Sequence, residues 1–170
     1  MDQSEAAPAL QETLRELVGE LLVACRQRNL RLTTAESCTG GLVAAALTAV
    51  AGSSAVFERG FVTYSNEAKI EILGVPKTMI DRHGAVSEAV ARAMAEGAIA
   101  HSRADLAISI TGVAGPDGGT AAKPVGLVHF ATARRNGATM AEMRLFPGDR
   151  DSVRLAAVAA ALRLIVGRLD

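Results

Sequence analysis

The stretch TTAESCTGGLVAA, residues 33–45, places small and hydroxyl residues before two glycines and an alanine-rich apolar run. The residues up to 35 are typical of a short buried strand, and the run after the glycines is typical of a helix. Two side chains that can act as nucleophiles, Ser37 and Cys38, therefore lie where a strand turns into a helix. The stretch predicts an α/β fold and draws attention to the chemistry of this turn.

Helical and extended patterns alternate through the rest of the chain. Helices are predicted at 10–29, 40–51 and 66–73, after Pro76, and at 87–102 and 149–169. Strands are predicted at 31–35, 55–64, 105–111, 125–133 and 139–146, and Asn136-Gly137 predicts a hairpin turn between the last two. This order is typical of a three-layer α/β/α sandwich with a mixed β-sheet.

The chain length of 170 residues favours one domain. We expect that domain to cover residues 10–170, after a loose segment at 1–9. The last helix, 149–169, is apolar on more than one face, which indicates either deep burial or contact with a partner subunit. From it we expect a homo-oligomer.

The composition restricts the partners. Eighteen basic residues balance eighteen acidic ones, and only one Tyr, four Phe and no Trp are present. A basic face for a polyanion and a stacking platform for single-stranded bases are therefore not expected, and we predict no nucleic-acid partner. The N-terminus does not resemble a signal peptide, and no stretch of about eighteen apolar residues exists to span a bilayer. We expect a cytoplasmic protein with no membrane partner and a small-molecule ligand.

The turn at Ser37 has two interpretations. An oxyanion formed at Ser37 would lie beside unpaired backbone N–H groups at the start of a helix, and Gly40 and Gly41 would allow close approach of a substrate. Alternatively, Ser37 or Thr39 only caps the helix. The residues alone leave both open.

A serine nucleophile needs a base. The three histidines, His83, His101 and His129, lie in segments that predict structural or surface roles. Lys69, on the first turns of the helix at 66–73, is the other candidate, because burial would lower its pKa and free its amine. A solvated lysine is the alternative, and the 32 residues between Ser37 and Lys69 do not decide whether the two meet.

The segment TGVAGPDGGTAAKPVG, residues 111–126, is rich in glycine and follows a predicted buried strand. Such a loop can wrap backbone N–H groups around an anion. It matches neither the Walker A pattern nor the dinucleotide fingerprint. By itself it predicts a phosphate site and a structural turn equally well. The two cysteines, Cys25 and Cys38, exclude a disulfide framework and a four-thiolate zinc site.

Five motifs in order, TTAESCTGG, GSSAVFERGFVTYSNEAK, HGAVSEAVA, SITGVAGPDGGT with KPVG, and GDRDSVR, resemble the CinA C-terminal domain family. The resemblance runs from about residue 10 to the C-terminus. Stand-alone members of that family are bacterial nicotinamide mononucleotide deamidases. It therefore implies an amidohydrolase that converts nicotinamide mononucleotide (NMN) and water to nicotinate mononucleotide and ammonia, without a metal or other cofactor.

The resemblance also implies residue roles. Ser37 would be the nucleophile, Lys69 its general base and Tyr64 an orienting group in the same site. Arg150 would be a further site residue, and the loop at 112–120 our expected phosphate site. The expected substrate-binding residues are Glu36, Cys38, Thr39, Gly40, Thr111, Gly112, Gly115, Gly118, Gly119, Thr120 and Arg150.

Three points stay open. Cys38 is an alternative nucleophile, because a helix N-terminus lowers a thiol pKa. Ala121-Ala122 stand where the family often has Pro-Glu, which could loosen the loop. The alternative functions are a nucleotide-binding module without turnover, an amidase for another carboxamide, and a competence-related interaction protein. The N-terminal pyrophosphatase-like domain of larger CinA proteins is not expected here.

Overall fold

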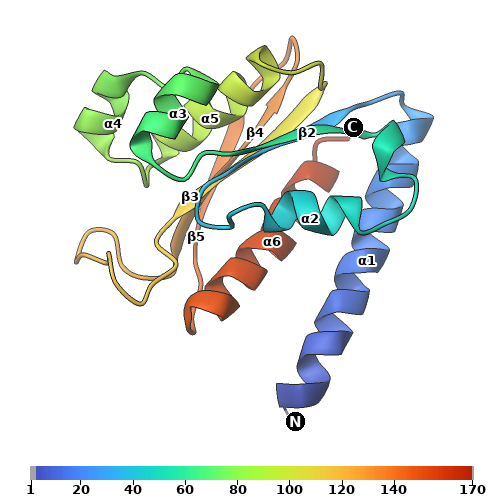
Figure 1. Ribbon diagram of the computed structural model, residues 1–170, viewed down its shortest axis with the longest axis horizontal. Helices are drawn as coiled ribbons and strands as arrows, with labels where there is room; N and C mark the ends of the chain where they lie inside the picture. Colours follow the sequence, from blue (N-terminus) through green and yellow to red (C-terminus); the bar gives the residue numbers. More distant parts are fainter. Residues whose placement is uncertain (1–2, 170) are drawn as a thin grey trace.

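The computed structural model describes residues 3–169, with side chains from residue 12 onward. Five strands form one mixed sheet that lies between two layers of helices (Figure 1). The predicted three-layer α/β/α sandwich is thus confirmed. The prediction of a loose segment at 1–9 falls partly on residues 1 and 2, which lie outside the described residues, and it stays a prediction.

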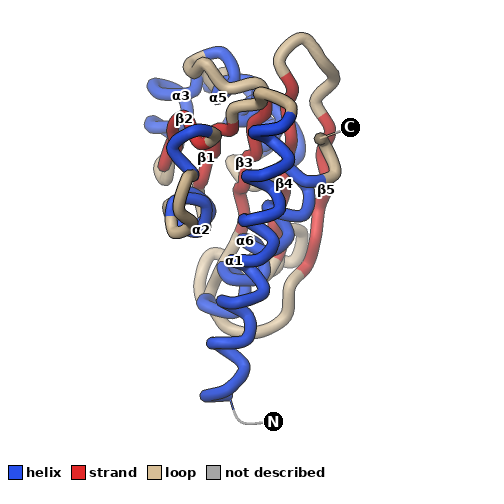
Figure 2. Tube along the Cα trace, turned by 90° about the vertical axis from the view of Figure 1, so that its right-hand side faces the viewer, coloured by secondary structure: helices blue, strands red, loops and turns tan. Residues whose placement is uncertain are grey.

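The strand order in the sheet is β2-β1-β3-β4-β5, and Figure 2 shows β2 and β5 at its two edges. The first three of these strands run parallel, whereas β4 is antiparallel to both β3 and β5. The strands are β1 (Leu32–Glu36), β2 (Phe57–Val62), β3 (Leu106–Gly112), β4 (Leu127–Arg134) and β5 (Met140–Leu145). The predicted hairpin joins β4 to β5, and in its turn Asn136 has a positive φ of 59° while the Gly137 N–H donates to the carbonyl of Arg134 at 3.0 Å.

Six α-helices and one short 3₁₀ helix occur within residues 3–169. They are α1 (Gln3–Gln27), α2 (Leu42–Thr48), α3 (Asn66–Leu73), α4 (Lys77–His83), α5 (Glu88–Ala100), α6 (Arg150–Val166) and the 3₁₀ turn η1 (Ser53–Ala55). The first helix begins seven residues earlier than its leucine spacing predicts, and η1 was not predicted. Within the described residues, no helix combines the length and apolar character that crossing a membrane requires.

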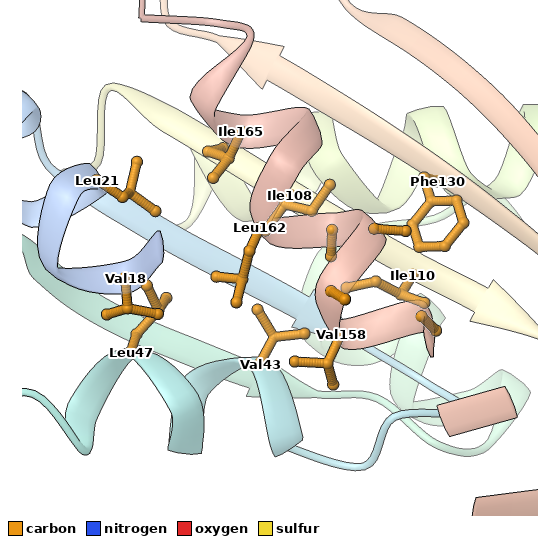
Figure 3. Packing of buried hydrophobic residues seen from close by; sticks show 14 of the residues in the cluster. Val18, Leu21, Val43, Leu47, Ile108, Ile110, Phe130, Val158, Leu162 and Ile165 are labelled. Carbon is orange, nitrogen blue, oxygen red and sulfur yellow. The ribbon is translucent and has the colours of Figure 1, made fainter. Parts of the chain in front are cut away.

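Each face of the sheet has its own hydrophobic cluster. On one face, α1, α2 and α6 bury the larger side chains of the strands, including Ile108, Ile110 and Phe130 (Figure 3). On the other face, α3, α4 and α5 pack mainly on small strand residues such as Ala35, Ala107 and Ala131. The alternation follows from the two-residue period of strands, and the small residues let α5 approach the sheet closely.

The apolar last helix is explained by burial within the protein. Val153, Ala157, Val158, Leu162 and Ile165 on α6 are all buried against the sheet and neighbouring helices. No partner subunit is needed to account for them. The homo-oligomer therefore stays a prediction, and the pattern from which it was inferred no longer supports it.

The strand order places a crevice at one end of the sheet. From β1 the chain crosses first to β2 on one side and later to β3 on the other side, so its direction of winding reverses between β1 and β3. In open α/β sheets, ligands bind beside such a reversal, at the carboxyl ends of the parallel strands. Ser37 follows β1 there, Tyr64 follows β2, and the glycine-rich loop follows β3.

Candidate active site

Ser37 is the first residue beyond β1. Its backbone N–H donates to the carbonyl of Ile110 on β3 at 2.9 Å, so the neighbouring strand fixes its position. The residue is 9% exposed. Ser37 makes no side-chain capping contact with α2, whose N-cap residue is Gly41. The helix-cap interpretation of Ser37 is therefore wrong for this structure.

Lys69 reaches Ser37 from helix α3. Its Nζ lies 3.1 Å from Ser37 Oγ and 2.9 Å from the carbonyl oxygen of Thr63. The carbonyl oxygens of Tyr64 and Ser65 are 3.2 and 3.4 Å from the same nitrogen. The two residues meet because β2 pairs with β1 and α3 begins directly after β2, where Ser65 caps the helix by accepting from the N–H of Ala68. The solvated alternative for Lys69 is wrong.

Burial sets the charge preferences of this site. Lys69 is 1% exposed, and loss of hydration lowers the pKa of its amine, opposed only by the nearby Cys38. Burial raises the pKa of the Cys38 thiol to about 11, aided by Glu36 and opposed by Lys69 and Arg154. The thiol therefore stays protonated near neutral pH, which disfavours Cys38 as the nucleophile.

A cavity of about 280 Å³ opens above the pair. Its walls contain nine of the predicted site residues: Ser37, Cys38, Tyr64, Lys69, Thr111, Gly112, Gly115, Gly118 and Arg150. The structure thus brings segments after β1, β2 and β3 and the start of α6 to one site. The volume is close to the lower end of the range of ligand pockets, about 300 Å³.

Arg150 connects two walls of the cavity. Its Nη2 donates to the hydroxyl of Tyr64 at 3.0 Å, and its Nη1 donates to the carbonyl of Gly115 at 2.7 Å. Tyr64 is 59% exposed, so its ring lies at the mouth of the cavity. A guanidinium held in this place provides a fixed cation at the entrance.

Three predicted substrate-binding residues, Glu36, Thr39 and Gly40, do not line the cavity. Glu36 is fully buried, and its carboxylate accepts from the N–H groups of Gly41, Val43 and Ala44 at 2.8–3.0 Å. It therefore fixes the start of α2. Gly40 has a φ of 61°, so the turn itself requires a glycine here.

Gly119 and Thr120, also predicted to bind substrate, lie farther along the loop and outside the cavity. Thr120 closes a turn with Lys123: its N–H donates to the Lys123 carbonyl at 2.9 Å, and its Oγ1 accepts from the Lys123 N–H at 3.0 Å. Lys123 Nζ in turn donates to the carbonyl of His83 at 2.6 Å. These contacts hold the loop, which the sequence led us to expect to be looser at Ala121-Ala122.

Sequence reasoning missed several residues of the site. The unpredicted cavity residues are Asn66, Ala85 and Val86, whereas Val113, Ala114 and Asp117 lie within the loop at 112–120 that was predicted as a whole. It also missed Arg154, which donates to the carbonyls of Cys38 and Thr39. One signal could have found Arg154: it lies four residues after Arg150, on the same face of a predicted helix. Within the described residues, no group of three His, Cys, Asp or Glu side chains is arranged to hold a metal ion.

Comparison with known proteins agrees with this architecture. The sequence profile of the CinA C-terminal domain matches residues 11–169. The chain belongs to the CinA C-terminal domain family. This CinA domain superposes on the crystal structure of the competence/damage inducible protein CihA from Agrobacterium tumefaciens with a TM-score of 0.88 and 49% identity. That alignment covers 91% of this chain and 94% of the other.

Curated relatives of this CinA domain differ in length. It is 55% identical over 152 residues to the nicotinamide-nucleotide amidohydrolase PncC of Escherichia coli K12, covering 89% of this chain and 90% of that protein. It is 52% identical to a CinA-like protein of Akkermansia muciniphila, of which it covers 36%. It likewise spans 40% of a relative from Symbiobacterium thermophilum. The chain thus matches one part of these longer relatives and nearly all of the shorter one.

Proposed function

We propose that this protein is an amidohydrolase that converts NMN and water to nicotinate mononucleotide and ammonia. The observation that carries the proposal is the buried Lys69 amine, 3.1 Å from the Ser37 hydroxyl at the wall of a cavity. The similarity to PncC, named a nicotinamide-nucleotide amidohydrolase, supports the choice of substrate. We propose no cofactor for the reaction.

The contacts of Lys69 suit a neutral amine acting as a base. A neutral amine has two N–H bonds and one lone pair, and the two nearest carbonyls, of Thr63 and Tyr64, can accept both hydrogens. The lone pair then faces Ser37 Oγ and accepts its proton. Because burial lowers the pKa of Lys69, this neutral form is populated at a lower pH than for an exposed lysine.

In the proposed acylation step, Ser37 Oγ attacks the carboxamide carbon while its proton passes to Lys69. We assign the stabilisation of the tetrahedral oxyanion to the backbone N–H groups of Cys38, which lines the cavity, and of Thr39, whose side chain does not face it but whose N–H belongs to the peptide that follows Cys38. The N–H of Gly40 is excluded from this role, because it donates to the Ser37 carbonyl at 3.0 Å. Lys69 then protonates the leaving nitrogen, the C–N bond breaks, and ammonia departs.

In the proposed second step, water cleaves the ester formed with Ser37. Lys69, neutral again, accepts a proton from that water, and the hydroxide attacks the acyl carbon. Collapse of the second tetrahedral species releases nicotinate mononucleotide and returns the proton to Ser37 Oγ. Both steps thus use the same base and the same oxyanion donors.

We further propose how the nucleotide is held. The Arg150 guanidinium and the backbone of the glycine-rich loop would bind the phosphate. Asp117, on the same loop, repels a phosphate but accepts hydrogen bonds from hydroxyl groups, so it suits the ribose. The pyridine carboxamide would then lie deepest, against Ser37.

The test is ammonia release from NMN, with chelator present, by wild type, Ser37→Ala, Lys69→Met and Lys77→Met. Lys77 is a surface lysine on the neighbouring helix α4 and controls for loss of a lysine charge. Turnover by wild type and Lys77→Met alone supports the proposal. Turnover that survives in Ser37→Ala contradicts the dyad.

The same assay with nicotinamide riboside and free nicotinamide separates the alternatives. Loss of turnover without the phosphate supports the phosphate site, and equal turnover of all three compounds points to a general amidase. Binding of NMN by a folded wild type that releases no ammonia would favour a binding module. Against such a module stands the buried Lys69 amine, since burying it destabilises the fold and pure binding does not require it.

A further inference from the structure

The turn that follows Ser37 is held by two charged side chains. The buried Glu36 carboxylate accepts hydrogen bonds from the N–H groups at the start of α2. Arg154 of α6 donates hydrogen bonds to two carbonyl groups of the turn itself. Its Nε donates to the Cys38 oxygen and its Nη2 to the Thr39 oxygen, both at 3.2 Å. The turn between strand and helix thus has little freedom to rotate.

Few other contacts account for the position of Arg154. Its side chain is 27% exposed, and its nearest carboxylate, Asp151, is 3.8 Å away and 83% exposed. Such an exposed ion pair contributes little. The two carbonyls of the turn are therefore the principal partners of this guanidinium among the described residues.

Peptide geometry links these carbonyls to the proposed oxyanion donors. In a planar trans peptide the C=O and the following N–H point in opposite directions. When Arg154 holds the Cys38 carbonyl, it also fixes the direction of the Thr39 N–H, which points away from the guanidinium. The positive charge further polarises that peptide group and makes its N–H a stronger donor.

We infer that Arg154 is a positioning residue for the oxyanion site. Arg154 does not itself line the cavity, and it acts through the turn by orienting and polarising the peptide between the cavity residue Cys38 and Thr39. The inference rests on the proposed acyl transfer at Ser37. It assigns to α6 a second role besides carrying Arg150 at the cavity mouth.

The test compares wild type, Arg154→Gln, Arg154→Lys and Arg163→Gln. Arg163 lies on the same helix, exposed and away from the cavity, and controls for loss of charge on α6. We expect Arg154→Gln to lower kcat for NMN by about 10- to 100-fold, less than removal of an oxyanion donor. Arg154→Lys, which offers one compact ammonium, should restore part of kcat, and Arg163→Gln should match wild type.

Binding measured separately distinguishes positioning from a merely structural role. Titration of NMN into Ser37→Ala and into the double variant with Arg154→Gln should give Kd values within about twofold of each other, since positioning acts on the transition state. A kcat within twofold of wild type for Arg154→Gln would overturn the inference. So would a rise in Kd equal to the fall in kcat/KM.

A serine-directed fluorophosphonate separates this inference from the proposed substrate. Its fluoride leaves as Ser37 Oγ bonds to phosphorus, and the phosphoryl oxygen occupies the oxyanion site. If wild type is labelled at Ser37 but does not hydrolyse NMN, the proposed substrate is wrong, and slower labelling of Arg154→Gln still supports the inference. Equal labelling rates contradict it. Wild type that neither labels nor hydrolyses NMN contradicts both.

Discussion

At Lys69, three backbone carbonyls and one serine hydroxyl surround an amine that burial separates from water. Carbonyl oxygens partly offset the loss of hydration, but no carboxylate lies within ion-pair distance among the described residues to stabilise a charged form. Desolvation therefore dominates, and the pKa of Lys69 lies below its usual value. The chemistry proposed for this site depends on this lowering of the Lys69 pKa by loss of hydration.

A pH profile of NMN hydrolysis tests this environment. Protonated Lys69 cannot accept the Ser37 proton, so kcat/KM should rise with pH as Lys69 deprotonates. Because the pKa is lowered, the midpoint should fall below about 10.4, the usual value for lysine. The Lys77→Met variant should keep this midpoint. A midpoint at or above the usual lysine value would contradict the desolvation argument.

The neighbouring Cys38 gives a second prediction. Its thiol is protonated near neutral pH, so replacing it with the slightly smaller alanine should leave kcat for NMN within about threefold of wild type. Ser37→Ala should lose at least about a thousandfold, as removal of a nucleophile does. Steady-state ammonia release measures both. Comparable losses in the two variants would mean that the thiol takes part in the reaction.

At the scale of elements, close contact between α3 and α5 positions Lys69. Gly97 of α5 faces the C-terminal end of α3, where an added Cβ would lie 2.1 Å from the carbonyl oxygen of Leu73. Only a glycine allows the two helices to approach so closely. Lys69 lies one turn earlier on α3, so this packing supports the distance between Lys69 and Ser37.

The paired variants Gly97→Ala and Gly19→Ala test that contact. Gly97→Ala should destabilise the protein by about 3 kcal/mol, because α5 or α3 must shift. Gly19, in the middle of α1, has no atom within 4 Å of an added Cβ, so Gly19→Ala should stabilise the helix by about 0.5–1 kcal/mol. Urea unfolding measures both. Equal effects of the two substitutions would exclude a steric contact at Gly97.

At the scale of the whole molecule, the core and the site share helix α6. Its middle packs into the larger hydrophobic cluster, whereas its first turn carries Arg150 and Arg154 to the site. Leu162, fully buried, lies two turns beyond Arg154 in the centre of that cluster (Figure 3). Substitutions in the middle of α6 should therefore change stability, whereas substitutions in its first turn should change activity.

Leu162→Ala should lower the free energy of unfolding by about 2–5 kcal/mol, through lost burial and the cavity left behind. Leu155→Ala, on the same helix but 39% exposed, should cost less than about 1 kcal/mol. Neither should change kcat while the protein is folded, because neither residue lines the cavity. Chemical unfolding and ammonia release provide the two measurements. A loss of kcat in folded Leu162→Ala would contradict this separation.

The sequence alone predicted the layers, the hairpin and most elements, because periodicity, glycines and capping residues act locally. Local patterns did not reveal that Ser37 and Lys69 meet, since their contact depends on the pairing of β1 with β2. That expectation came from the resemblance to a family. The prediction that Glu36 and Gly40 bind substrate was wrong for the same reason. Both residues stabilise the turn before α2, and only the fold shows that they do this and do not face a ligand.

The β4–β5 hairpin turns at the opposite end of the sheet from Ser37 and Lys69. Asn136 and Gly137 are exposed at its tip, and the register places the turn beside the first residue of β3, whereas the cavity lies after the last. This tip is thus a natural attachment point. A fluorescent domain or an affinity tag spliced between Asn136 and Gly137 would leave the mouth of the cavity clear, and the protein could be tethered to a surface with the cavity facing solution.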